Sequence, residues 1–362
     1  MELRSSSCAV FSRHDLLHSR LEKGQCPVRT HRAQDILAHR APFRKYKGQM
    51  RYTPFCPEHG LRIHRDGFVY YNGRSKHDVG IATRRNLVFN SDYYVRNILE
   101  SGAKVESKRL CYESSEDAVT YNVFTELLSH GFPLNELVAQ IAGREVPGTV
   151  ELYLWGGSVD LVKGKFVPCE HLKEVRRVLE KDVGPFQTEP DIMLIIPHKI
   201  LICIEAKFGS KNPIAKDSND TAGQKPKSVR GLRARYCEGN PLVDSKEIFD
   251  FGKDSERFHE QIFRNIVFAV SMSKLASIDE WYVANLRNQH VMNLKRGKPE
   301  SLPIVRNVRS ILKRPFKKRF VHLTWEDIYE KIVKPRAEGD LSDLAHYFKT
   351  KSLNCRRAFN CF

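Results

Sequence analysis

The chain has 362 residues, and its 60 Lys and Arg against 43 Asp and Glu give a formal net charge of +17, which favours a polyanionic partner, nucleic acid first and an anionic membrane surface second. A hydrophobic fraction of 41% excludes disorder throughout, and no apolar run approaches the ~20 residues that span a bilayer. The nine cysteines are scattered without a CxxC pair, so we expect no disulfide framework and a cytoplasmic protein with no membrane partner.

The N-terminal third of the chain divides into two parts by composition. Residues 1–43 form a basic extension without a core pattern. Residues 44–112 alternate aromatic and turn residues, which predicts a small β-rich region of short strands and hairpins, with a helix from Ser91. Cys56 and His59 in this region resemble half of a metal knuckle. Zinc normally takes four ligands in two pairs, so we expect none there.

The clearest helix start in the chain follows this region. Ser114 or Ser115 can cap the helix, and Glu116 lies in its first turn, where an acidic side chain is favourable. Apolar residues continue at helical spacing, and Gly131 with Pro133 is expected to end the helix. Further elements are predicted in chain order: strands at 149–155 and 158–162, a helix at 170–181, a hairpin at 192–206, a long loop or lid at 208–250, a helix at 257–275, strands at 280–285 and 320–323, a helix from Trp325 capped by Thr324, and a C-terminal helical tail at 336–362.

The predicted hairpin brings two carboxylates and a lysine together. With His198 at the centre of an exposed turn, Asp191 lies directly opposite Glu205, and Lys207 shares the face of Glu205. Directly opposed side chains have Cβ atoms ~5 Å apart, so the carboxylates repel unless a divalent cation lies between them. Oxygen ligands favour Mg²⁺, or Mn²⁺ in its place. Because Lys207 can orient a water molecule or neutralise a phosphate, this set on a basic chain predicts phosphodiester hydrolysis.

These residues resemble a known signature. Pro190-Asp191, then 13 residues, then Glu205-Ala206-Lys207 is similar to the motif of the PD-(D/E)XK nuclease superfamily, the restriction-endonuclease-like enzymes. The resemblance covers residues 113–335 and implies an α/β fold with a mixed sheet flanked by helices. It also implies an Mg²⁺-dependent deoxyribonuclease in which Asp191, Glu205 and the Ala206 carbonyl hold the metal.

The resemblance further implies catalytic residues outside the hairpin. Glu116 matches the family's first acidic position and would be a third metal ligand, although Asp117 and Glu113 compete for this role. Gln261, on the helix after the hairpin, resembles an additional active-site glutamine of several subfamilies. Arg264 lies on nearly the same helix face and is expected to contact nucleic acid.

Two basic stretches flank the predicted site and favour phosphate contacts. The expected contacts are Lys211, Lys225, Lys227 and Arg230 in the lid, and Lys313, Arg314, Lys317 and Lys318 in the second stretch. We therefore expect a DNA endonuclease. By analogy with the family its role would be restriction or defence, and the sequence leaves open whether it forms a homodimer. A catalytically inactive nucleic-acid-binding protein of the same fold is the main alternative, and a basic adaptor for an anionic partner is the third. The chain has no Walker A loop, Rossmann glycine fingerprint or HExxH motif.

Overall fold

The computed structural model describes residues 40–46, 49–54, 62–64, 67–69, 76–101, 110–112, 115–185, 187–208, 210, 212–215, 220–252, 258–288 and 301–350. The chain forms two compact units, one of residues 1–126 with 341–362, and one of residues 127–340. The division falls within one helix, α5 (Glu116–His130).

The first unit joins short hairpins to helices from both ends of the chain. Its elements are β1 (Arg40–Tyr46), β2 (Gln49–Pro54), β3 (Arg62–His64), β4 (Gly67–Val69), α3 (Lys76–Asn86), α4 (Ser91–Tyr94), the π-helical turn η1 (Val95–Leu99), the start of α5, and α13 (Ser342–Thr350). The sequence predicted the hairpins and the helix from Ser91, but not α3. The buried Asn122 of α5 connects these helices, because its amide donates to the Asn86 carbonyl at 3.1 Å and to the Tyr347 hydroxyl at 3.2 Å.

The second unit is α/β and is built on a mixed open sheet. Among the described residues the sheet has seven strands in the order β11-β10-β9-β8-β5-β6-β7, where β9, β10 and β11 are parallel neighbours and the other pairs are antiparallel. The strands are β5 (Glu151–Leu154), β6 (Gly157–Asp160), β7 (Lys165–Pro168), β8 (Ile192–Ile196), β9 (Ile200–Lys207), β10 (Glu280–Arg287) and β11 (Phe320–Thr324). The helices are α6 (Phe132–Ala142), α7 (Glu170–Leu179), α8 (Val229–Arg233), η3 (Ala234–Glu238), α9 (Ser245–Ile248), α10 (Glu260–Leu275), α11 (Ser301–Ser310), η5 (Arg314–Arg319), α12 (Trp325–Ile328), η6 (Tyr329–Val333) and η7 (Lys334–Arg336).

The predicted hairpin at the centre of this sheet is confirmed. Strands β8 and β9 are buried on both faces, and they are apolar as far as Ile204, as expected of central strands covered by helices. Ile192 pairs with Ile204 and Ile196 with Ile200, which is the register that a turn centred on His198 requires. His198 is exposed and has a φ of 61°.

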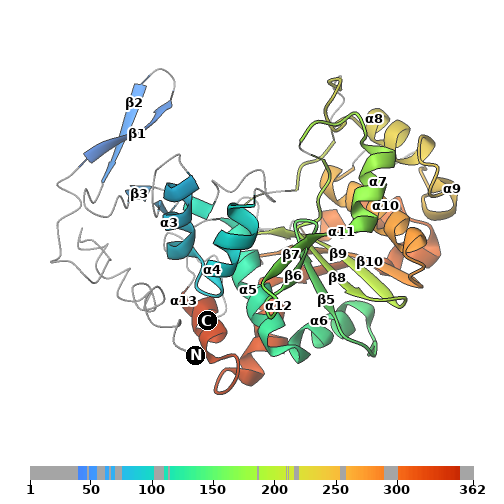
Figure 1. Cartoon of the computed structure of the whole chain (residues 1–362). Coiled ribbons are helices and arrows are strands. Elements are labelled where there is room, and N and C mark those ends of the chain that lie inside the picture. The colour runs from blue at the N-terminus through green and yellow to red at the C-terminus, as the bar shows by residue number, and fades with distance from the viewer. Residues whose placement is uncertain are drawn as a thin grey trace. The chain divides into compact units, whose positions relative to one another are not determined.

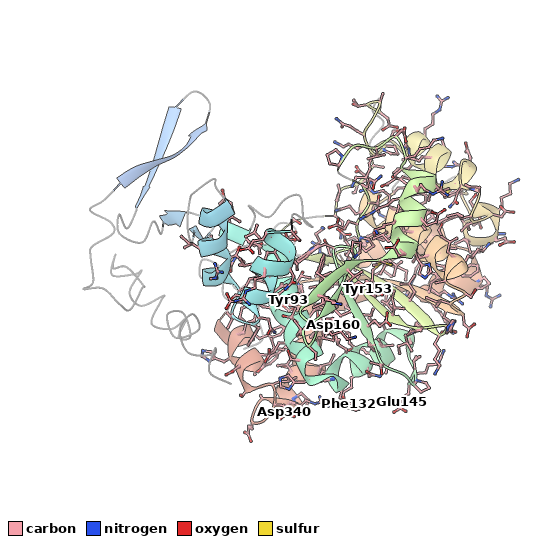
Figure 2. All side chains as sticks on the ribbon, in the orientation of Figure 1. Tyr93, Phe132, Glu145, Tyr153, Asp160 and Asp340 are labelled. Atoms are coloured by element: carbon pink, nitrogen blue, oxygen red, sulfur yellow. The ribbon has the colours of Figure 1, made fainter. Side chains whose placement is uncertain are left out.

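Helices cover both faces of the sheet (Figure 1). Helices α7 and α10 lie on one face, where α10 contacts β9 and β10, while α6 lies on the other face and contacts β10 and η6. On the α10 face the core contains Met193, Cys203 and Val283 together with the helix residue Phe268. Tyr153 of β5 packs against the margin of this core (Figure 2).

The prediction of a long loop at 208–250 is wrong for its second half. Helices α8 and α9 and the π-helical turn η3 form there. Leu232 and Tyr236 are fully buried, and the Tyr236 ring lies edge-on to Phe268 of α10 with centroids 6.3 Å apart. These few apolar side chains anchor the segment to the core, although the surrounding polar residues obscured the helical pattern in the sequence.

Two helix boundaries were also predicted from local signals. Gly131 and Pro133 were expected to end one helix, but they also begin the next one, because Pro133 occupies the first turn of α6, a position that needs no amide donor. Thr324 caps α12 as predicted, in a capping box with Asp327.

Candidate active site

One end of the sheet changes from apolar to polar on three neighbouring strands. The parallel strands β9, β10 and β11 place three rows of residues on the α10 face: Cys203, Val283 and Phe320, then Glu205, Asn285 and His322, then Lys207, Arg287 and Thr324. The first row is apolar and the other two are polar. The carboxyl ends of parallel strands are where open α/β sheets bind their ligands, so the polar rows mark a candidate active site.

Asp191 lies at the start of β8, next to Glu205. Its main-chain carbonyl accepts from Trp155 N–H at 3.2 Å, and its Oδ2 accepts from Ala206 N–H at 2.8 Å. Strand β8 begins at Ile192, as predicted, so Asp191 precedes the strand by one residue. The preceding Pro190 has no N–H for the ladder, and the Asp191 side chain takes the place of a main-chain acceptor. The carboxylate thus lies at the Glu205–Ala206 peptide bond.

Glu205 and Lys207 form a buried ion pair. The Lys207 Nζ lies 2.5 Å from the Glu205 Oε1, and the two residues are only 7% and 2% exposed. Asn265 of α10 donates to the other carboxylate oxygen, Oε2, at 2.9 Å. The Lys207 carbonyl accepts from the Trp325 indole at 3.1 Å, which fixes the end of β9. Sequence reasoning missed Asn265, although it lies one helical turn after Gln261 and so on the same face of the helix.

The predicted residues on α10 and in the lid have different environments. Gln261 is half-buried, and Arg264 is only 6% exposed. Lys225 donates to the Gln187 carbonyl at 3.3 Å, and burial, together with the nearby charge of Arg264, lowers its pKa to about 8. Lys227 and Arg230 are exposed, whereas Lys211 lies outside the described residues. Arg264 is thus an internal cation of the second unit, whereas the sequence predicted a contact with nucleic acid.

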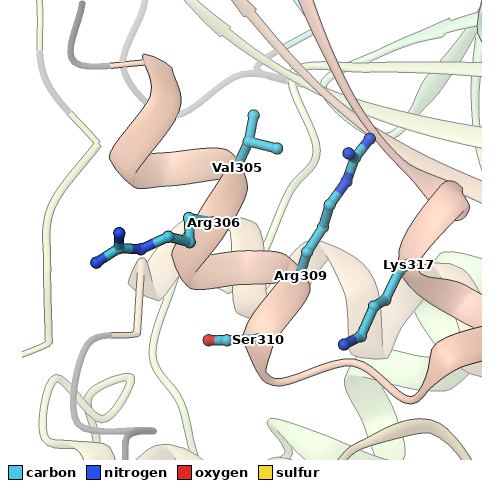
Figure 3. A pocket seen from close by; sticks show the side chains of 5 residues that line it. All are labelled: Val305, Arg306, Arg309, Ser310 and Lys317. Atoms are coloured by element: carbon cyan, nitrogen blue, oxygen red, sulfur yellow. The ribbon is translucent and has the colours of Figure 1, made fainter.

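The second basic stretch forms an exposed groove beside β11. The predicted contacts Lys313, Arg314, Lys317 and Lys318 are all exposed. A groove of about 620 Å³ is lined by Val305, Arg306, Arg309, Ser310 and Lys317 (Figure 3). The Arg309 guanidinium donates to the Phe320 carbonyl at 3.1 Å, so α11 and the groove are attached to the first residue of β11.

The remaining predicted positions belong to the first unit. Glu116 and Asp117 lie in the first turn of α5, where Ser115 Oγ accepts from Ala118 N–H at 3.2 Å and caps the helix as predicted. The role of Glu116 as a catalytic residue and metal ligand stays a prediction. Glu113, Cys56 and His59 lie outside the described residues.

The chemistry of the site suits a hard cation held by two carboxylates. Within the described ranges no group of three or more His, Cys, Asp and Glu could hold a metal ion. Asp191 and Glu205 nevertheless supply oxygen ligands, and each carboxylate oxygen can accept at more than one lone pair. Mg²⁺ is usually bound through one or two carboxylates, with water and substrate phosphate completing its shell. The residues present therefore fit Mg²⁺.

Comparisons with models of protein families, with curated proteins and with solved structures give no match. In the part of the chain that the structure describes, no helix is both long and apolar enough to cross a membrane. The site must therefore be interpreted from its own geometry.

Proposed function

We propose that this chain is a Mg²⁺-dependent endonuclease that hydrolyses phosphodiester bonds in DNA, of the PD-(D/E)XK kind. The observation that carries the proposal is the arrangement of the Asp191 carboxylate at the Glu205–Ala206 peptide, beside the buried Glu205–Lys207 pair. The order of elements in the chain supports it, because α5, β5, the β8–β9 hairpin, α10 and β10 follow the helix, strand, hairpin and helix of that superfamily.

A purely structural role would not favour this arrangement. Burying an ion pair costs several kcal/mol per ion in desolvation, and well-packed apolar residues of similar volume are often as stable or more so. The first row of the same strands is apolar, so the core could continue with apolar residues to the end of the sheet. Buried charges at the carboxyl ends of the parallel strands instead favour a functional site.

Each side chain has a distinct part in the proposed hydrolysis. A water oxygen adds to phosphorus, the bond from phosphorus to one ester oxygen breaks, and that oxygen leaves with a proton, which gives a phosphomonoester and an alcohol. Asp191, Glu205 and the Ala206 carbonyl would hold Mg²⁺, which supplies Lewis acidity and lowers the pKa of bound water. Lys207 places its ammonium beside Glu205, where it orients the water and offsets charge on the phosphate. Asn265 holds Oε2 of Glu205 in position.

The exposed basic groove supports nucleic acid as the substrate. Arg306, Arg309 and Lys317 line it without an acidic residue among its lining side chains, and phosphate backbones bind such surfaces with release of counterions. The groove is connected to β11, the strand next to β10, through Arg309.

The deciding experiment is cleavage of supercoiled plasmid by the full chain in Mg²⁺, Ca²⁺ or EDTA. We expect cleavage in Mg²⁺ alone, and its loss in Glu205→Gln and Lys207→Met. The matched controls are Glu170→Gln and Lys173→Met, which alter an exposed acid–lysine pair on α7 with an N···O distance of 2.7 Å. Circular dichroism shows whether each variant is folded. Cleavage by folded Lys207→Met at the wild-type rate would refute the proposal.

The same assay separates the second candidate function. A catalytically inactive nucleic-acid-binding protein of this fold would retard DNA in a gel with salt-dependent affinity but leave the plasmid intact in Mg²⁺. The basic groove favours this alternative equally, so only the cleavage result separates the two functions. DNA that is neither bound nor cut would instead indicate an adaptor for another anionic partner.

A further inference from the structure

A chain of hydrogen bonds connects the second row of the site to β11. The Asn212 side-chain amide donates to the Asn285 Oδ1 at 2.8 Å, and the Asn285 amide nitrogen lies 3.3 Å from His322 Nδ1. Asn212 is 6% exposed and Asn285 is fully buried. Because the Asn285 oxygen already accepts from Asn212, its amide group must be the donor toward His322.

This bond fixes the tautomer of His322. Burial lowers the pKa of His322 to about 4, with the positive charge of Arg287 as the second cause, so the ring is neutral at pH 7. A neutral ring that accepts at Nδ1 carries its proton on Nε2. The Nε2 atom is buried and has no hydrogen-bond partner among the residues that the structure describes. It is therefore a donor without an acceptor, which is rare in a folded interior.

His259, at the start of α10, is a buried ring. It is 5% exposed, and burial lowers its pKa. A backbone hydrogen bond at Asn212 acts in the opposite direction, and the charge of Arg287 adds to the lowering. Arg287 is only 1% exposed and lies beside Lys207 in the third row. Both histidine rings thus lie in the positive potential of Arg287, although Asp327 acts in the opposite direction on His322.

We propose that His322, His259 and Arg287 form an anion subsite that takes the phosphodiester next to the scissile one, a role that rests on the proposed nuclease function. The subsite offers an N–H donor and a fixed positive charge, which suit an oxygen ligand that carries negative charge and only accepts hydrogen bonds. His322 lies two strands from Glu205, which is ~10 Å at the usual strand spacing. The same polar rows would therefore hold two phosphates of one strand, one at Lys207 and one at His322.

A purely structural explanation fits these contacts less well. A structural network satisfies its members internally, because a partly satisfied buried network is less stable than an apolar core. Here the bonds lead from Asn212 through Asn285 to His322, and end at a donor without a partner in the described structure. The positive potential at the ring also disfavours a cation as the missing partner.

The test uses inorganic phosphate and the ¹⁵N-labelled full chain. We expect the His322 ring resonances, followed by NMR, to shift with phosphate at constant ionic strength and to titrate at a higher pH than in chloride, since a bound anion favours the imidazolium. The exposed His171 of α7 is the internal control. Ring resonances of His322 that respond to phosphate no more than those of His171 would overturn the subsite.

DNA affinity in Ca²⁺ provides a second measurement. His322→Phe removes the donor and should weaken binding by about ten-fold or more, the usual effect of losing a hydrogen bond to a charged group. His322→Gln keeps an N–H donor near the Nε2 position and should bind more tightly than His322→Phe. Equal affinities of wild type and folded His322→Phe would count against the subsite.

The results also separate this subsite from the nuclease function. A wild-type chain that leaves plasmid intact, but whose His322 resonances respond to phosphate, retains the subsite and refutes the nuclease function. A chain that cuts DNA while His322 is indifferent to phosphate, and while His322→Phe binds DNA normally, retains the nuclease function and refutes the subsite. A His322→Phe variant that does not fold leaves the NMR titration of the wild type as the decisive result.

Discussion

Replacing Asn265 tests the geometry of the proposed site most directly. Asn265→Leu keeps the approximate volume of a 2% exposed side chain but removes the amide that donates to Glu205 Oε2 at 2.9 Å. The carboxylate stays buried beside Lys207 and loses one of its donors. Both the free energy of unfolding and the cleavage rate should therefore fall.

The size of the effect follows from the burial and charge of this bond. A hydrogen bond to a charged group contributes ~1.5–3 kcal/mol, and because Glu205 is 2% exposed, water does not readily replace the lost amide. For a unit of this size ~1 kcal/mol shifts the melting temperature by ~2–4 °C. We thus expect Asn265→Leu to melt ~3–12 °C below the wild type.

A double-mutant cycle isolates this bond from other effects of the substitution. Urea unfolding followed by circular dichroism gives the free energy of unfolding for Asn265→Leu, Glu205→Gln and the double variant. We expect a coupling energy of at least ~1 kcal/mol between contacting buried residues. The control cycle uses Lys274 of the same helix and Glu247, an exposed pair at 3.6 Å, whose coupling should stay within ~0.5 kcal/mol. Additive effects at Asn265 and Glu205 would refute the argument.

Three further predictions follow from the site and its surroundings. Mg²⁺ at 100 times its dissociation constant should stabilise the wild type by ~2.7 kcal/mol and so raise its melting temperature. Asp191→Asn should remove this rise, and an unchanged rise would exclude Asp191 as a ligand. Burial lowers the pKa of Lys225 from 10.5 to about 8, so the unfolded chain binds more protons between these values. The free energy of unfolding should then rise by up to ~3 kcal/mol as pH increases through this interval, and Lys225→Met should abolish the rise in pH-dependent urea titrations. The logarithm of the DNA association constant falls linearly with the logarithm of salt concentration, with a slope of about −0.9 per phosphate contact. The double variant Arg309→Gln, Lys317→Gln should therefore reduce the steepness of this slope by ~0.9 for each lost contact. Lys173→Gln, which changes an exposed lysine of α7, should leave the slope unchanged.

The centre of the fold was predictable because its determinants are local. Strand β8 and the first five residues of β9 are uninterrupted apolar runs around a short turn, so the sequence alone predicts both the hairpin and its register. Strand parity then places Glu205 and Lys207 on one face, and the structure confirms this through their 2.5 Å contact. Likewise Thr324 and Asp327 are close enough in sequence for the capping of α12 to be anticipated.

The neighbours of the hairpin were not predictable by the same means. The registers between the parallel strands β9, β10 and β11 depend on long connections. The sequence shows no sign that Asn285 lies between Glu205 on one side and His322 on the other. That the Asp191 side chain accepts from the Ala206 N–H of β9 is a contact that strand periodicity does not predict. Asn265 needed only the helical spacing from Gln261, once the packing face of α10 was known.

The polar end of this sheet costs stability, which is itself an argument for its function. Cys203, Val283 and Phe320 show that the α10 face can be filled with apolar side chains, and continuing this pattern by one row would bury hydrocarbon in place of Glu205, Asn285 and His322. The chain instead buries a charge and an amide, and beside them lies the half-buried imidazole of His322, whose buried Nε2 has no partner in the described structure. Proteins place unpaired polar groups and charges in their interior mainly at functional sites, where a bound ligand offsets the lost stability. Under the proposed function, a metal-bound phosphodiester chain offsets this cost, because it complements both the two carboxylates and the proposed positive subsite.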